Sequence, residues 1–289
     1  MEVLLVVEVL LVAVAHQEDF KKIENNMLYK ASILNGWGFN MIYIIVNEEY
    51  KMVEEVEKKF EEYLMDFDKT EKIEWKHIHS YRVANLAKYI AEKENLNQYD
   101  TDLVYSIGLL HDIGRFYQLK MFDTYNDNKS IDHGDMGEVV LNKDSDYKKI
   151  FKDDYSVLIK AVKNHNKYEI EEGLNERELY FSKLVRDVDK IDILVATIEG
   201  HLKYEEEGGE IHKIYKEEFF SNKLLRRRPE VICKYGYITL LSFAYDINFN
   251  SCMQYIKDNN IYSKLYSIVV NKNVYDEYFE YILNYIKKI

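Results

Sequence analysis

The chain has 289 residues but only one proline and eleven glycines. These two residue types interrupt helices most strongly, and folds with many β-turns depend on them. Their scarcity therefore favours long helices. Hydrophobic residues make up 47% of the chain, which is enough for a sizeable core. The predicted fold class is all-α.

The N-terminus begins with a nearly continuous apolar stretch, Val3–Ala15. Its end, Ala13-Val14-Ala15, is similar to a signal-peptide cleavage site. Three features argue against this reading: the first basic residue is Lys21, Glu8 interrupts the stretch, and its length is too short for a membrane-spanning helix. We therefore expect neither a secretory signal nor a membrane partner.

Met41–Val46 is rich in β-branched residues and is a candidate short strand. No catalytic motif accompanies it. From Val53 onward the apolar residues recur with helical spacing. Residues 1–52 are therefore predicted to be an irregular or β-containing extension without an assigned function, and residues 53–289 are predicted to form the functional domain.

The formal net charge of −12 creates a field that repels a phosphate backbone, so duplex nucleic acid is not an expected partner. The one dense basic run, Arg226-Arg227-Arg228, is interpreted as a solvated helix end. Cys233 and Cys252 form no metal-binding or disulfide pattern. This cysteine usage favours a reduced, cytoplasmic protein.

Four histidines adjoin the apolar stripes of predicted helices. In residues 78–93, His79 shares its stripe with Val83, Leu86 and Ile90, at spacings of four, three and four. His133 and His165 stand beside similar stripes. His16, His77, His201 and His212 have no such setting.

His111 and Asp112 come directly after an apolar run in the next predicted helix. Asp100 or Thr101 is expected to cap this helix and Gly114 to end it, which places the pair in its last turn. Burying such polar groups without partners costs roughly 2–7 kcal/mol for a neutral group. A bound metal ion would remove that cost.

With Asp189, these residues make a set of six imidazole and carboxylate groups, which suits Mn, Fe, Co, Ni or Zn. Six ligands are too many for one catalytic ion, so two divalent ions are expected, bridged by Asp112. The alternative for Asp112 is that it orients His111. The predicted metal ligands are His79, His111, Asp112, His133, His165 and Asp189.

Three segments carry a family resemblance. Lys76-x-x-His79-Ser80-x-Arg82-Val83, Leu110-His111-Asp112-Ile113-Gly114-Arg115-Phe116 and Val188-Asp189-Lys190-Ile191-Asp192 resemble the motifs of the HD-domain metal-dependent phosphohydrolases. The similarity extends from about Val53 to at least Val195. It implies an all-helical HD-domain bundle that the C-terminal helices complete.

The resemblance also implies the metal ligands His79, His111, Asp112 and Asp189, while His133 and His165 are similar to those of members with two metals. Asp187 is the second choice for the last ligand, and Asp192 is also within one turn. Family members that hydrolyse cyclic dinucleotides carry a Gly-Tyr-Pro segment, which is absent from this chain. That subgroup is excluded.

The expected activity is hydrolysis of a small phosphorylated metabolite, with a nucleotide favoured, by attack of a metal-bridging hydroxide on phosphorus. Asp112, His111 and Arg115 are the predicted catalytic residues. Arg82, Arg115 and Lys190 are predicted to bind substrate phosphate, and ion pairing with the acidic ligands is an equally weighted alternative.

Two other functions share this ligand set: a di-iron oxygenase of HD type, and a nucleotide-sensing HD module without catalysis. The Tyr-rich C-terminal residues raise a separate question. Tyr235–Tyr245 fits both a core segment and a homodimer contact, and core is the expectation.

Overall fold

The computed structural model describes residues 37–203, 211–226, 228 and 236–289, with side chains from residue 51 onward. The chain divides into two compact units, residues 1–50 and 51–289. The predicted boundary at residue 52 stays a prediction, because helix α3 (Trp37–Leu64) runs across it. The apolar stretch Val3–Ala15 and Cys233 lie outside the described residues.

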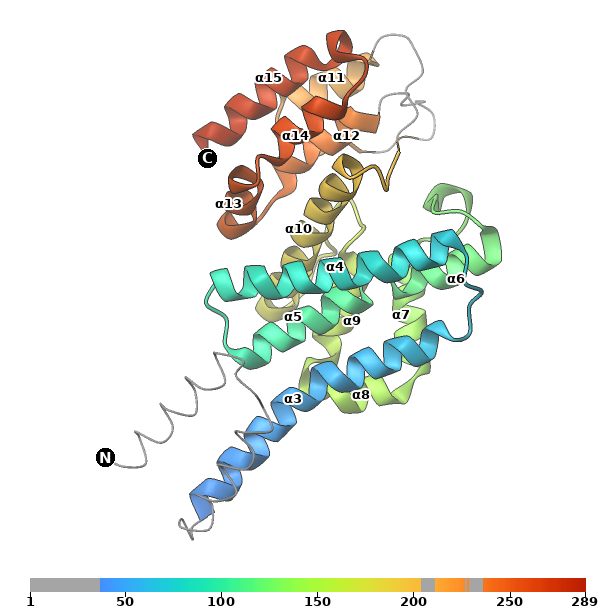
Figure 1. The fold of residues 1–289 in the computed structure, drawn as a ribbon, viewed down its shortest axis with the longest axis vertical. Coiled ribbons are helices and arrows are strands. Elements are labelled where there is room, and N and C mark those ends of the chain that lie inside the picture. The colour runs from blue at the N-terminus through green and yellow to red at the C-terminus, as the bar shows by residue number, and fades with distance from the viewer. Residues whose placement is uncertain (1–36, 204–210, 227, 229–235) are drawn as a thin grey trace, which may run out of the picture. The chain divides into compact units, whose positions relative to one another are not determined.

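All regular elements of the described residues are helices, which confirms the predicted all-α class (Figure 1). After α3 come α4 (Glu71–Lys93), α5 (Gln98–Leu110), α6 (Ile113–Phe122), α7 (His133–Lys143), α8 (Ser145–Phe151), α9 (Tyr155–Asn164) and α10 (Glu176–Ile198). The C-terminal helices are α11 (Lys213–Phe220), α12 (Gly236–Ser242), α13 (Asn250–Asp258), α14 (Ile261–Ile268) and α15 (Lys272–Lys288). Short 3₁₀ helices are η1 (Asp127–Lys129), η2 (Lys152–Asp154) and η3 (Phe243–Asp246).

The candidate strand Met41–Val46 is wrong, because these residues lie inside α3. Isoleucine and valine cost a helix only a few tenths of a kcal/mol each relative to the best helix formers. No proline or glycine separates the run from the strongly helical segment that follows. Continuity of the helix therefore outweighs the local β preference.

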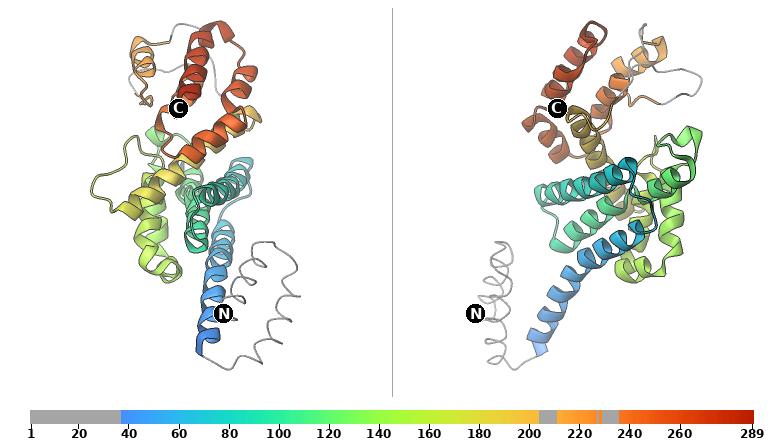
Figure 2. Two further views of the ribbon diagram at one scale, coloured as in Figure 1. Left: turned by 90° about the vertical axis from the view of Figure 1, so that its left-hand side faces the viewer. Right: turned by 45° about the vertical axis from the view of Figure 1, so that its right-hand side comes forward.

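The centre of the fold is a helical bundle. α4 packs along α5, α10 packs on α9, α4 and α5, and α7 packs on α6 and α9. The views in Figures 1 and 2 agree that α4 and α5 lie side by side. Fully buried side chains fill the space between these helices, and they include Ile90, Ile107, Phe116, Leu158 and Ile191. The polar groups of the candidate site are therefore enclosed by an apolar core.

The observed helix ends differ from two predicted ones. Asn97 caps α5 by accepting a hydrogen bond from the backbone N–H of Asp100, so Asp100 and Thr101 are not the cap. Gly114 lies inside α6 and does not end α5. The chain leaves the helix earlier, at His111 and Asp112, which join α5 to α6.

Gly114 is required by a close approach between two helices. A Cβ atom at this position would lie 2.2 Å from the backbone oxygen of His133 and 2.5 Å from the backbone nitrogen of Gly137. The start of α6 therefore touches the first turn of α7. This contact holds the His111-Asp112 junction next to His133.

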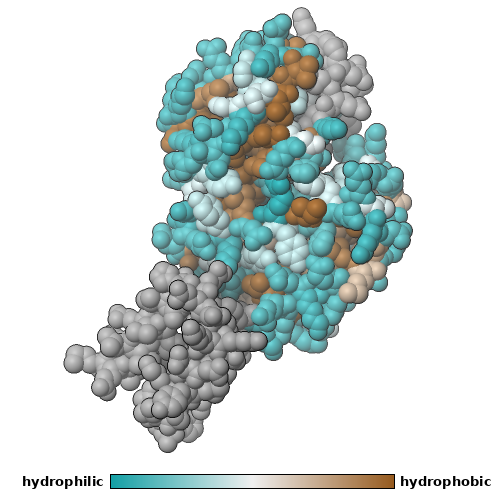
Figure 3. Space-filling model, in the orientation of Figure 1, coloured by the Kyte–Doolittle hydropathy of each residue, from teal (hydrophilic) through white to brown (hydrophobic). Residues whose placement is uncertain are grey.

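The C-terminal helices pack through aromatic side chains. Phe219 contacts Tyr245 and Tyr278, and Tyr275 and Phe279 of α15 are buried. In the Tyr-rich stretch, the described residues Ile238, Leu240, Leu241 and Ala244 are buried, so it contributes to the core as expected. On the face shown in Figure 3, hydrophobic side chains gather over the C-terminal helices. None of the helices in the described ranges combines the length and apolarity needed to cross a membrane.

Gly114→Ala should destabilise the protein by about 2 kcal/mol or more, because backbone atoms surround the added methyl group and cannot yield. Gly137→Ala is the matched control on the facing helix. Its added methyl would lie 2.6 Å from a side-chain methyl of the buried Val162, which must shift, but no backbone atom is as close, so we expect a smaller loss of about 1–2 kcal/mol. Urea denaturation of both variants measures the difference; equal destabilisation would contradict the close-approach role of Gly114.

Candidate metal centre

The four predicted histidine ligands are buried and share one hydrogen-bonding arrangement. His111 Nδ1 donates to the Gly108 carbonyl at 2.6 Å, and His165 Nδ1 donates to the Val162 carbonyl at 2.7 Å. A carbonyl oxygen only accepts hydrogen bonds, so the proton of each ring lies on Nδ1. The lone pair of each Nε2 is left free to bind a cation.

The other two histidines are oriented by carboxylates. His79 Nδ1 lies 2.7 Å from Asp192 Oδ2, and His133 Nδ1 lies 2.8 Å from Asp127 Oδ2. A carboxylate acceptor fixes the same tautomer and makes the ring a stronger ligand. All four rings therefore direct an Nε2 lone pair into one enclosed space.

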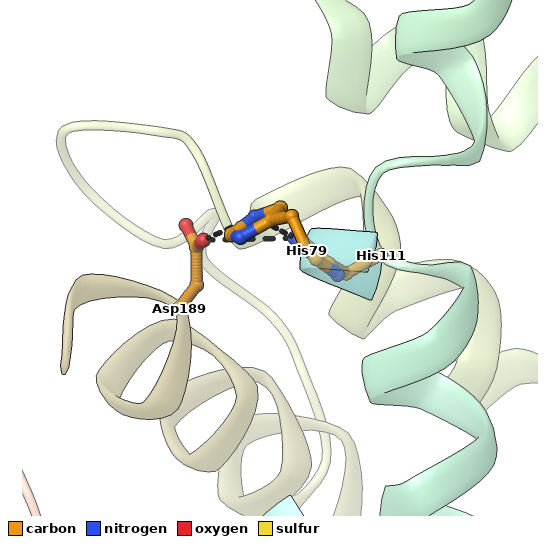
Figure 4. Close-up of side chains that lie close together, drawn as sticks. All are labelled: His79, His111 and Asp189. Carbon is orange, nitrogen blue, oxygen red and sulfur yellow. Dashed lines mark hydrogen bonds and ion pairs between the residues drawn. The ribbon is translucent and has the colours of Figure 1, made fainter. Parts of the chain in front are cut away.

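His79, His111, Asp112 and Asp189 form a first cluster of candidate ligand atoms. His79 Nε2 lies 3.2 Å from both His111 Nε2 and Asp189 Oδ1, and 3.4 Å from Asp112 Oδ2. His111 Nε2 lies 3.6 Å from Asp189 Oδ1. Figure 4 shows His79, His111 and Asp189 pointing toward one another from α4, the end of α5 and α10.

Asp112, His133 and His165 form a second cluster. The two Nε2 atoms lie 3.0 Å apart, and Asp112 Oδ1 lies 3.3 Å from His133 Nε2 and 3.5 Å from His165 Nε2. Asp112 thus turns one carboxylate oxygen to each cluster. Ligand atoms of His111, Asp112 and His165 lie within 4.8 Å of one another, so the clusters adjoin.

The spacing of these atoms fits ligands around a cation. Ligands bonded at about 2.1 Å lie about 3.0 Å apart around an octahedral ion and about 3.4 Å apart around a tetrahedral ion. When His133 and His165 carry their protons on Nδ1, their facing Nε2 atoms cannot hydrogen-bond to each other. Divalent cations would satisfy these lone pairs, so the residues of both clusters fit divalent metal ions.

Charges around the clusters shift the acidity of their members. Burial opposes ionisation of Asp112, but Lys76 and His111 hold its pKa well below the usual value. Burial also favours the neutral form of His79, whereas Asp112, Asp189 and Asp192 stabilise its cation and raise its pKa to about 10. Divalent ions must therefore compete with protons for this cluster.

Asp187 and Asp189 occupy different surroundings on α10. Asp187 faces away from the clusters and accepts hydrogen bonds from the backbone N–H groups of Asn248 and Phe249 at 2.7 and 2.9 Å. Burial raises the pKa of this carboxyl to about 6. Asp192 binds His79 Nδ1 and orients the ring. The geometry thus brings Asp189, of the three aspartates, to the Nε2 atoms.

The three predicted substrate-binding cations have separate positions. Arg82 does not line the cleft beside the clusters; it pairs with Asp192 at 2.7 Å and with Glu199 at 2.5 Å. Its geometry therefore favours the ion-pair alternative. Arg115 and Lys190 both line this cleft.

The cleft has a volume of about 500 Å³ and adjoins both clusters. Arg115 pairs with Asp127 at 2.8 Å, and its buried Nε lies 3.5 Å from Asp112 Oδ1. Lys190 is buried and pairs with Asp246 at 2.9 Å. A guanidinium and an ammonium group on the wall of one cleft are suited to an anionic ligand.

Lys76 and Asp127 were not assigned roles from the sequence. Lys76 Nζ lies 2.5 Å from Asp112 Oδ2 and lines the cleft. Its position three residues before His79 places both on one helix face, and this spacing could have identified it. Asp127 begins the short 3₁₀ helix η1 in a polar stretch without apolar periodicity, so no local signal connects it to His133.

Residues 77–197 match the family model described as HD domain. This match confirms the resemblance to the HD-domain family that the three motifs carry. All six candidate ligands, from His79 to Asp189, lie within the matched residues. The superfamily consists mostly of metal-dependent phosphohydrolases. No match was found among curated proteins or among solved structures.

Asp189→Ala should lower the metal content by about one ion per chain, because it removes a carboxylate from the first cluster only. Asp187→Ala is the matched control two residues away. It should leave the metal content unchanged and cost about 1–3 kcal/mol of stability through its lost backbone hydrogen bonds. Mass spectrometry of the metals and thermal unfolding measure the two effects. Metal loss on replacing Asp187 would reverse the assignment.

Proposed function

We propose that this protein is a metal-dependent phosphohydrolase that uses two divalent ions, and that its substrate is a small phosphorylated metabolite, with a nucleotide favoured. The main support for this proposal is that four buried Nε2 atoms face the two oxygens of one carboxylate, that of Asp112. Two adjoining clusters that share a carboxylate are the arrangement used for hydrolytic reactions at phosphorus.

Bound divalent ions would supply an acidic water and neutralise charge on the phosphoryl group. The protein's own groups hold the reacting parts in place. Asp192 and Asp127 fix the rings of His79 and His133 through their Nδ1 atoms. Because these rings cannot rotate without losing a hydrogen bond, the ligand geometry is set before substrate binds.

Cationic groups support the binding of a phosphoryl group in the cleft. Lys76 lies at its wall against Asp112, and Arg115 also lines it. A planar guanidinium and an ammonium can donate to different phosphoryl oxygens. They also offset the repulsion of an anion by the acidic residues of the site. Asp112 and His111 lie where both clusters meet.

His111→Ala and Asp112→Ala should each lower phosphate release by about a thousandfold or more, because several kcal/mol of transition-state stabilisation depend on the ions they hold. The same variants should lose bound metal. His77→Ala, on the same helix as His79 but directed at Glu61, is the control and should retain both. Phosphate release from a panel of nucleotides and sugar phosphates is the measurement.

The panel is assayed without oxygen after reconstitution with manganese or zinc. Phosphate release under these conditions rejects the oxygenase alternative, whose reaction consumes oxygen. Tight nucleotide binding without turnover in any metal would favour the sensing module. Full activity of metal-free Asp112→Ala protein would falsify the proposed mechanism.

A further inference from the structure

The cleft extends beyond the metal clusters to residues outside the matched HD domain. Four residues of α10 line it, Arg186, Asp189, Lys190 and Ile193. Their spacing places them on one helix face about 10 Å long. Residues 224–226, Thr239 and Phe243 also line the cleft. A phosphoryl group bound at the metal clusters would leave much of the cleft to the rest of the substrate.

Most cations that line the cleft have carboxylate partners. Lys76 pairs with Asp112, Arg115 with Asp127, Lys167 with Asp132, and both Arg186 and Lys190 with Asp246. Arg226 differs from them. Among the residues the structure describes, none of the carboxylates lies within ion-pair distance of its exposed guanidinium.

Arg226 is nevertheless held in position. Its guanidinium lies over the ring of Tyr168, 5.5 Å from the ring centre. The Tyr168 hydroxyl donates to the Leu224 carbonyl at 3.1 Å, and the backbone N–H of Leu225 donates to Ser242 Oγ at 3.1 Å. Leu224 and Leu225, which precede Arg226, are thus held by hydrogen bonds to Tyr168 and Ser242. A guanidinium stacked on an aromatic ring keeps its in-plane N–H groups available to a ligand.

Tyr168 links Arg226 to the second cluster. It follows His165 by three residues, so their Cα atoms are at most about 11 Å apart. Arg186 donates to the backbone carbonyls of His165, Lys167 and Tyr168, which fixes the connecting segment. Arg226 therefore stands near the metal clusters without being part of them.

We propose that Arg226, with Tyr168 as its support, binds a second anionic group of the substrate, separate from the phosphoryl group that is hydrolysed. This inference rests on the proposed function and narrows its substrate class to metabolites with two anionic groups, such as nucleotides with more than one phosphate. The apolar side chains of Leu224 and Phe243 line the same cleft and suit the uncharged body of such a molecule.

The test uses ligands that cannot be hydrolysed, so that binding is measured apart from turnover. Alkane diphosphonates of increasing chain length carry two anionic groups, and alkylphosphonates of the same lengths carry one. Calorimetry with the metal-loaded full chain should show that the best diphosphonate binds at least about tenfold more tightly than its single-headed counterpart.

Arg226→Ala should remove most of this preference and leave alkylphosphonate binding within about twofold of the original. Arg226→Lys should keep part of it, because the charge remains but the planar stacking group is lost. Lys223→Ala is the matched control: it removes one charge from the same segment at a position that does not line the cleft. It should keep the full preference.

Equal binding of the two ligand types to the original protein, or an unchanged preference in Arg226→Ala, would overturn the inference. Equal losses for both ligand types in Arg226→Ala would also overturn it. A diphosphonate preference without phosphate release from any substrate would instead refute the proposed hydrolysis and leave the binding role of Arg226 standing. The two failures are therefore distinguishable.

Discussion

Four imidazole rings donate their Nδ1 protons outward and leave four Nε2 atoms facing one another and the oxygens of Asp112 and Asp189. Such an arrangement is costly in a dry interior and becomes favourable when a cation occupies it. The packing of the helical bundle holds these ligand groups together. α4 supplies His79, and α10 supplies both its outer carboxylate partner Asp192 and the inner carboxylate Asp189. The contact at Gly114 brings α7 against the His111-Asp112 junction.

The sequence predicted much of this because ligands on a helix leave a periodic signal. His79 stands in register with Val83, Leu86 and Ile90, and Asp189 falls in a motif on one long helix. The partners that orient the rings were harder to recognise. Asp127 lies in a short 3₁₀ helix within a polar stretch that has no apolar periodicity. Asp192 is one of three aspartates within two turns, and its contact with His79 depends on how α4 packs on α10.

The errors in the fold have a related cause. Local preference suggested a strand at Met41–Val46, but continuity with the helix that follows decided the outcome. Gly114 resembled a helix stop, yet its lack of a side chain serves a contact with a helix that begins almost twenty residues later. Arg226 was interpreted as a solvated helix end, and the structure places it on the wall of the cleft. The last two cases depend on neighbours that are distant in sequence.

Several of the site residues lie at the ends of helices. His111 follows the last residue of α5, Asp112 precedes α6, His133 begins α7 and His165 follows α9. Helix ends are normally where a folded chain opens most readily, and their amide hydrogens exchange early with solvent. Here these helix ends surround one set of ligand atoms. Occupancy of the site would therefore slow amide exchange at four separate helix ends together, so that local motion in distant parts of the sequence reports on a single binding event.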